Sequence, residues 1–260
     1  MRVPQQNLDD PSGLAWRRAW TLAILMLFPP ARRFMPTPIV SLAPRRSPSQ
    51  ARSVVTVAAV FEAAIQVLLK DGVHRLTTTR VAERAGVSVG SLYQYYPNKQ
   101  ALLNAVLERH LNGVVEAVEV AASRAHQRPL AVLVESVVHA FVTAKLDRAD
   151  EARALYAVAA ELARADLVKQ ASVRACRALA AALSTVTDAS FDDLPVTAYM
   201  FATAMIGPTK GLLEEEAPAK LARVIRRQLV SLCLGYLERE ASRSTSPLPT
   251  STVRRLRPRS

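Results

Sequence analysis

The sequence from residue 72 to residue 103 decides the fold; it reads Gly-Val-His-Arg-Leu-Thr-Thr-Thr-Arg-Val-Ala-Glu-Arg-Ala-Gly-Val-Ser-Val-Gly-Ser-Leu-Tyr-Gln-Tyr-Tyr-Pro-Asn-Lys-Gln-Ala-Leu-Leu. Its capping residues predict two short helices, because Thr77 is suited to begin one over Thr78–Ala85 and Ser88 another over Val89–Tyr95. The glycine between these helices permits a sharp turn. The pattern is typical of a helix-turn-helix unit, whose second helix enters the major groove of DNA.

A longer amphipathic helix precedes the pair and ends at Asp71-Gly72, where glycine can adopt the left-handed conformation. Its apolar residues recur at helical spacing and form one stripe: Val57, Val60, Phe61, Ala64, Ile65 and Leu68. After the pair, Pro97 stops the second short helix and Asn98 caps the next one. The sequence therefore predicts a three-helix unit.

The outward face of the second short helix is polar and aromatic and carries no acidic residue. Gln94 can read adenine through two hydrogen bonds, and Val89 suits a thymine methyl group. The hydroxyls of Ser91 and Tyr95 can bond phosphates. Lys99 lies in the first turn of the following helix, whose backbone amides favour an anion, so we expect a phosphate clamp there.

Residues 77–99 follow the pattern Thr-Thr-x-x-Val-Ala-x-x-Ala-Gly-Val-Ser-x-Gly-Ser-Leu-Tyr-x-Tyr-Tyr-x-x-Lys. This pattern resembles the signature of the tetracycline-repressor (TetR) family of bacterial transcription regulators, and the likeness covers about residues 50–110. A bare helical hairpin in an all-α protein is the alternative. Tyr96 departs mildly from the family, which usually has Phe there.

The resemblance implies which residues meet DNA. Those expected nearest the bases are Thr78, Val89, Gly90 and Gln94. Those expected to hold the DNA backbone are Thr79, Ser91, Tyr93, Tyr95 and Lys99. Two further members complete the predicted DNA-binding set, Ser88 at the start of the reading helix and Arg52 near the start of the preceding helix.

The net charge of +12 is concentrated at the two ends of the chain. Residues 1–52 hold eight Arg and two Asp, and residues 241–260 hold five Arg and no acid, whereas the body between them is nearly neutral. Such ends are usually disordered and solvated, but they can add salt-dependent affinity for phosphate. Arg45, Arg46 and Arg52 are placed either to reach DNA or simply to stay in solvent.

The first 48 residues are expected to be a disordered Arg/Pro-rich extension. The apolar run of residues 21–28 is too short to span a bilayer, which needs about 20 residues. A signal peptide is disfavoured because Pro29-Pro30 and further Arg follow the run instead of a cleavage site. We expect translation to start at Met35 and the protein to be cytoplasmic; a weak membrane-surface tether is the alternative.

The remaining chain predicts an all-α fold in which a DNA-binding domain over residues 49–110 precedes a helical domain over residues 111–240 and a disordered basic tail over residues 241–260. The helices are expected at about 98–125, 129–147, 149–163, 166–186, 193–213 and 218–240. In the family the last two helices pair with their mates to form a homodimer; an intramolecular core is the alternative. Pro208 inside the penultimate helix should kink it.

The resemblance also implies a small-molecule effector held among the middle helices. Aromatic residues with a few polar handles are typical of pocket walls, although each could instead be plain core. The candidate ligand-binding residues are Phe141, Tyr156, Tyr199, Phe201 and Met205.

No nucleophile elbow, phosphate loop, paired carboxylates or metal-ligand spacing of histidines occurs, so we expect no enzyme activity, catalytic residue, cofactor or metal. Cys176 and Cys233 lie in apolar helical patterns and are interpreted as buried small hydrophobes, with a redox switch as the alternative.

These patterns predict a regulator that binds a palindromic double-stranded DNA operator as a homodimer and is released by a small-molecule ligand, with no membrane partner. The alternatives are a helical DNA-binding protein without effector control and a transcriptional activator.

Overall fold

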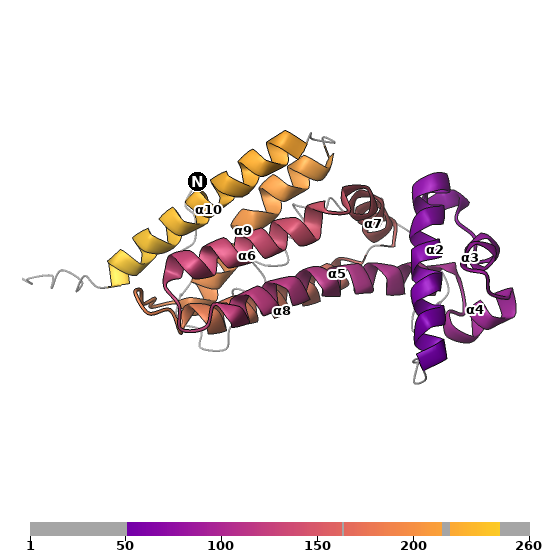
Figure 1. Ribbon diagram of the computed structural model, residues 1–260, viewed down its shortest axis with the longest axis horizontal. Helices are drawn as coiled ribbons and strands as arrows, with labels where there is room; N and C mark the ends of the chain where they lie inside the picture. Colours follow the sequence, from indigo (N-terminus) through magenta and orange to yellow (C-terminus); the bar gives the residue numbers. More distant parts are fainter. Residues whose placement is uncertain (1–50, 163, 215–218, 245–260) are drawn as a thin grey trace, which may run out of the picture.

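The computed structural model describes residues 51–162, 164–214 and 219–244, and within them it contains nine α-helices and no strand. The predicted all-α fold is therefore confirmed. Figure 1 shows an elongated molecule with three helices at one end and the others bundled behind them. The helices are α2 (Ala51–Arg75), α3 (Thr78–Ala85), α4 (Val89–Tyr95), α5 (Lys99–Arg124), α6 (Leu130–Leu146), α7 (Ala149–Glu161), α8 (Ala165–Leu183), α9 (Leu194–Glu214) and α10 (Ala219–Ser244).

The capping residues predicted from sequence begin α3, α4 and α5. The Thr77 hydroxyl accepts a hydrogen bond from Arg80 N at 3.3 Å, and Ser88 accepts one from Ser91 N at 3.0 Å. Asn98 accepts one from Ala101 N at 2.7 Å. The predicted turn also forms, because Gly86 adopts the left-handed conformation with φ of 68°.

Helices α2, α3 and α4 share a hydrophobic core with the first part of α5. Val60, Val81, Leu92 and Leu103 are all deeply buried there. The same core includes residues far along the chain, on α7 and at the start of α8: Leu155, Val158, Ala159 and Leu167. The three-helix unit is therefore closed from behind by α7, so its core is not self-contained.

A second core holds the larger bundle together, and α5 links the two because it runs from the first core into the second (Figure 1). In this bundle α5 packs against α6 and α8, while α9 and α10 pack against each other and α10 also contacts α6. Phe201, Leu229 and Cys233 are among its fully enclosed side chains.

Pro208 lies inside helix α9, which continues beyond it to Glu214. Proline removes one backbone donor from the helix. Just after it, the Thr209 hydroxyl donates to the backbone, with distances of 2.8 Å to Met205 O and 3.0 Å to Ile206 O. These bonds tie the residue after Pro208 to the preceding turn.

The last helix is longer than predicted, because α10 extends to Ser244 into the expected tail. The predicted extension, its Arg45 and Arg46, and the Met35 start lie outside the described residues. Among the residues that are described, no helix has the length and apolar character needed to cross a membrane. Both cysteines are free, and burial raises the pKa of the Cys176 thiol to about 12 and that of Cys233 to about 11.

Candidate nucleic-acid interface and ligand cavity

Helix α4 presents its polar face outward and anchors itself through Leu92, which is buried in the first core. Gly90 and Gln94 are exposed, and Tyr93 is 40% exposed. Val89 and Tyr95 are half-buried and pack against the core at their inner edges. Gly90 and Gln94 thus face outward as expected, whereas Tyr95, also expected to face outward, packs against the core.

Thr78, expected near the bases, lies beneath Tyr93. Its side chain is only 8% exposed, and its hydroxyl is 3.0 Å from the Tyr93 hydroxyl. A buried hydroxyl needs a hydrogen-bond partner, and this pair satisfies that need. Thr78 therefore orients Tyr93, whereas Thr79 beside it is exposed on α3.

The Ser88 hydroxyl is occupied by the local structure of α4. Besides capping Ser91 N, it is 2.8 Å from the Ser91 hydroxyl. Tyr96 is buried, and its ring centroid is 5.9 Å from that of Phe61. Burial raises the pKa of the Tyr96 phenol to about 12, so it stays neutral, and the residue serves as core like the Phe it replaces.

The Lys99 ammonium, expected at a phosphate, donates hydrogen bonds to the carbonyl oxygens of Val73 and, at 3.5 Å, of His74. These carbonyls lie at the C-terminal end of α2. Lys99 therefore ties the start of α5 to the end of α2. The side chain of Arg52 lies outside the described residues.

A cavity of about 190 Å³ lies among α5, α6, α7, α8 and α9. Of the predicted ligand-binding residues, Phe141, Tyr156, Tyr199 and Met205 line it. Phe201 does not, and is fully buried in the second core, where it packs as an ordinary core aromatic. The sequence pattern could not separate these roles, because all five residues share the same apolar and aromatic character.

The cavity also contains a charged residue that the sequence analysis missed. Lys145 on α6 is only 7% exposed, and its ammonium donates a hydrogen bond to the Tyr156 hydroxyl. Its nitrogen lies 4.6 Å from the Tyr156 ring centroid and 5.9 Å from that of Phe141, within reach of cation–π attraction. The available signal was a lysine inside the otherwise apolar run Val-Val-His-Ala-Phe-Val-Thr-Ala-Lys-Leu.

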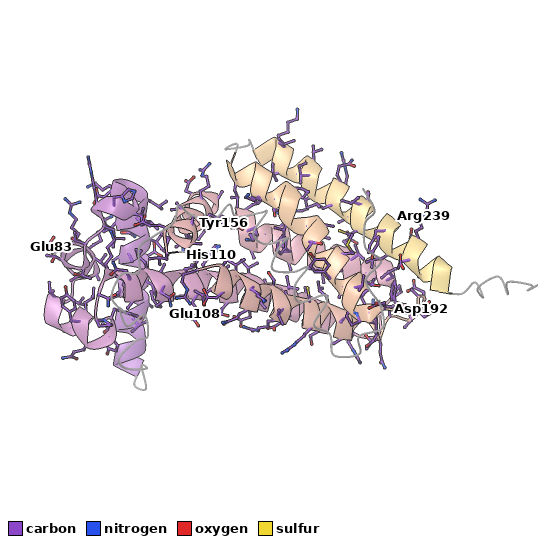
Figure 2. The ribbon with its side chains drawn as sticks, turned by 180° about the vertical axis from the view of Figure 1, so that it is seen from behind. Glu83, Glu108, His110, Tyr156, Asp192 and Arg239 are labelled. Carbon is purple, nitrogen blue, oxygen red and sulfur yellow. The ribbon has the colours of Figure 1, made fainter. Side chains whose placement is uncertain are left out.

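A cluster of charged groups connects this region to the three-helix unit. Arg148 pairs with Glu151, with Nε 2.7 Å from the carboxylate, and with Glu62 of α2 at 3.3 Å. Burial raises the pKa of Glu151, and Arg148 opposes that shift. Figure 2 places His110 and Tyr156 at the junction between the two parts of the molecule.

Burial, together with smaller contributions from the positive charges of Lys145 and Arg148, lowers the pKa of His110 to about 4. His110 is therefore neutral at pH 7, with Nδ1 at 3.8 Å from the Glu151 carboxylate. Elsewhere in the described ranges, no group of three His, Cys, Asp or Glu side chains is placed to hold a metal ion.

Two family models match the chain, and together they span more than half of it. The model for bacterial regulatory proteins of the tetR family matches residues 60–106, which cover most of the three-helix unit. The model for the tetracyclin repressor-like C-terminal domain matches residues 129–237, which cover most of the larger bundle.

Curated relatives match the chain over short stretches. The nucleoid occlusion factor SlmA of Actinobacillus pleuropneumoniae is 48% identical over 40 residues, 15% of this chain and 20% of the relative. The class C tetracycline repressor protein of Escherichia coli is 45% identical over 53 residues, 20% of this chain and 24% of the relative. The chain thus spans about a fifth to a quarter of the length of these relatives.

Solved structures match most of the fold at low identity. A TetR-family transcriptional regulator from Mesorhizobium loti has a TM-score of 0.61 and 16% identity over 73% of this chain and 98% of its own. SmeT, the repressor of the Stenotrophomonas maltophilia multidrug efflux pump SmeDEF, has a TM-score of 0.54 and 20% identity over 70% of this chain and 91% of its own.

The three-helix unit, its outward polar helix and the helical bundle behind it define an all-α protein with a helix-turn-helix of the DNA-binding type. The chain belongs to the TetR family of bacterial regulatory proteins.

Proposed function

We propose that this protein is a transcriptional regulator that binds a palindromic DNA operator as a homodimer and releases it when a small molecule binds. The observation that carries the proposal is the exposed face of α4, which lacks acidic residues, on a helix packed against the first core. The named functions of relatives support it, since the class C tetracycline repressor and SmeT are both called repressors. Operator binding would place the protein in the cytoplasm with the chromosome.

Gln94 and Val89 are proposed to read bases in the major groove, where Gly90 allows close approach of the backbone. Tyr93, held by Thr78, is proposed to bond a phosphate together with Thr79, Ser91 and Tyr95. The free amides at the start of α5 offer a further anion site, and Lys99 reaches the same phosphate only if its ammonium turns away from Val73 and His74.

The dimer is proposed to form through the outer faces of α9 and α10, because large apolar side chains are exposed there. On α10, Leu229 is buried in the core whereas Leu232 is 55% exposed. The exposed set on the two helices is Val196, Met200, Leu221, Val224 and Leu232. Contiguous exposed apolar surface commonly marks a protein interface. A twofold dimer would also double the number of bases read.

Ligand binding is proposed to release the operator by moving α7 as well as the long helix α5. Tyr156 of α7 lines the cavity, while the neighbouring Leu155 lies in the core of the three-helix unit. A ligand that displaces Tyr156 would therefore move a helix that supports the reading heads. The ligand shifts the equilibrium between the arrangement that binds DNA and the one that does not only by its difference in affinity for the two.

The proposal is tested by selecting binding sites from random double-stranded DNA with the full-length protein. We expect enrichment of an inverted repeat whose half-sites are centred about 34–36 Å apart, or somewhat more, along the DNA. Recovery of sequences with no common site would refute sequence-specific regulation.

A further inference from the structure

We propose that the cavity among α5, α6, α7, α8 and α9 binds a small monocarboxylic acid with a compact apolar body, whose carboxylate pairs with Lys145. The inference names the chemical class of the effector, so its regulatory meaning rests on the proposed function above. Binding itself can be tested without DNA.

The first argument is the buried charge of Lys145. Its ammonium is nearly enclosed, and its neighbours are the Tyr156 hydroxyl and the faces of two aromatic rings. Within the described residues no carboxylate lies within ion-pair distance of this nitrogen. A buried charge is costly unless it is paired, so an anionic partner entering the cavity would gain from the pairing.

The nearby acidic group is already committed elsewhere. Glu151 contacts Arg148 at 2.7 Å and His110 at 3.8 Å. The charges that act on its pKa are those of Arg148, Glu62 and Arg109, and Lys145 is not among them. The positive charge at the cavity is therefore not cancelled by Glu151, and neutral His110 adds none to it.

The second argument is that the cavity wall is mostly apolar and carries one charged side chain, Lys145. The hydroxyls of Ser172 and Thr203 line it, but each donates to its own helix, at 2.9 Å to Val168 O and 2.8 Å to Tyr199 O. Most of the remaining wall is aliphatic: Leu111, Val114, Val115, Val118, Val168, Ala171, Ala175, Leu179, Ala202 and Ile206. A ligand with one charged group and an otherwise apolar body matches this division.

The size of the cavity limits that body. An apolar protein cavity of about 150 Å³ holds benzene, and this one measures about 190 Å³. A body of about one aromatic ring or a short alkyl chain therefore fits. One ammonium neutralises one negative charge, which favours a monocarboxylate over a dianion such as a phosphate ester.

The test is isothermal titration calorimetry of the full-length protein with matched pairs of probes. These are benzoate and benzamide, phenylacetate and phenylacetamide, and hexanoate and hexanamide. Because a hydrogen bond to a charged partner is stronger than one to a neutral group, we expect at least one acid to bind tenfold or more tightly than its amide.

Two variants assign that preference to the proposed contact. Lys145→Met keeps the length of the side chain and removes the charge, so the preference for the acid should disappear while the amide still binds. Tyr156→Phe removes the oxygen that holds the ammonium, so the preference should fall but persist. Lys70→Met makes the same change at an exposed lysine of α2, outside the cavity, and should leave the preference intact, and circular dichroism checks that each variant folds.

The inference would be overturned if acids and amides bind equally or if no probe binds. It would also be overturned if the acid preference survives in Lys145→Met. Preferred binding of the amides would do so as well, and would indicate a neutral aromatic ligand. An acid that binds through Lys145 but leaves operator affinity unchanged would support the inference and contradict ligand-released regulation.

Discussion

At the scale of the residue, some side chains predicted to contact DNA also hold the local structure in place. The sequence predicts Thr78 and Ser88 as DNA contacts, yet their hydroxyls bond those of Tyr93 and Ser91. Each acts through a neighbour that faces outward. Residues of this kind lower the entropy that the reading surface must lose on binding, because the exposed side chains are already held in place.

Lys99 allows its two roles to be separated. Lys99→Ala should weaken binding to every DNA sequence similarly and lower the salt slope of log K by about one, if the ammonium meets a phosphate. It should also lower the free energy of unfolding by about 1 kcal/mol, because the bonds to the end of α2 are lost from a half-buried position. DNA affinity measured from low to high salt checks the first effect, and chemical denaturation checks the second. Loss of stability with an unchanged salt slope would restrict Lys99 to holding α2.

His110 should make stability depend on pH. Its pKa is near 6.5 in the unfolded chain and about 4 in the folded protein, so the unfolded chain binds more protons between these values. The contribution of His110 to the free energy of unfolding is fully present above pH 6.5. As the pH falls from 6.5 to about 4, the free energy of unfolding decreases by about 3 kcal/mol at most. Glu151 has a raised folded pKa and acts in the opposite direction.

The measurement is the free energy of unfolding against pH for the wild type and His110→Gln. The difference isolates His110 from Glu151, and the wild type should lose more stability on acidification. His126→Gln, at an exposed histidine, is the control and should leave the curve unchanged. Parallel curves for the wild type and His110→Gln would show that His110 keeps an ordinary pKa.

At the scale of the element, capping chemistry was the most reliable guide. Thr77, Ser88 and Asn98 begin their helices as predicted, because a cap depends on residues only three positions apart. The role of α7 in the first core could not be predicted, since it depends on a contact between segments about 90 residues apart in the sequence. The same holds for Lys145, whose burial is decided by α7 and its Tyr156.

Helix α7 should therefore be needed by the three-helix unit. Leu155→Ala removes a fully buried side chain from the core it shares with α2, and should cost about 2–5 kcal/mol of stability. Hydrogen exchange should speed up in α2 as well as in α7. Ala157→Ser, at an exposed position on the same helix, serves as the control. A loss below 1 kcal/mol, or exchange confined to α7, would mean that the unit does not depend on it.

At the scale of the whole molecule, a single helix of the length of α4 can contact only a few base pairs, which is too little to specify a site in a genome. Two copies related by a twofold axis overcome this limit, and the exposed apolar faces of α9 and α10 are suited to join them. Pro208, a reason from sequence to doubt a straight dimerisation helix, lies within a helix that continues to Glu214.

Leu232→Asp should produce monomers and abolish operator binding, because it places a charge in the centre of the proposed apolar interface. Gln170→Asp introduces the same charge at an exposed position of α8, outside the proposed interface, and is the control. Light scattering gives the oligomeric state. A Leu232→Asp protein that remains dimeric would place the interface elsewhere on the molecule.

The most direct measurement of the central claim, that the outward face of α4 reads bases, compares the wild type with Gln94→Ala on every single-base variant of the selected operator. Gln100→Ala, an exposed glutamine on α5, is the control. We predict that Gln94→Ala costs about 1–3 kcal/mol and loses discrimination at one base pair of each half-site, while other positions keep theirs. An equal loss of affinity for operator and random DNA would contradict the account.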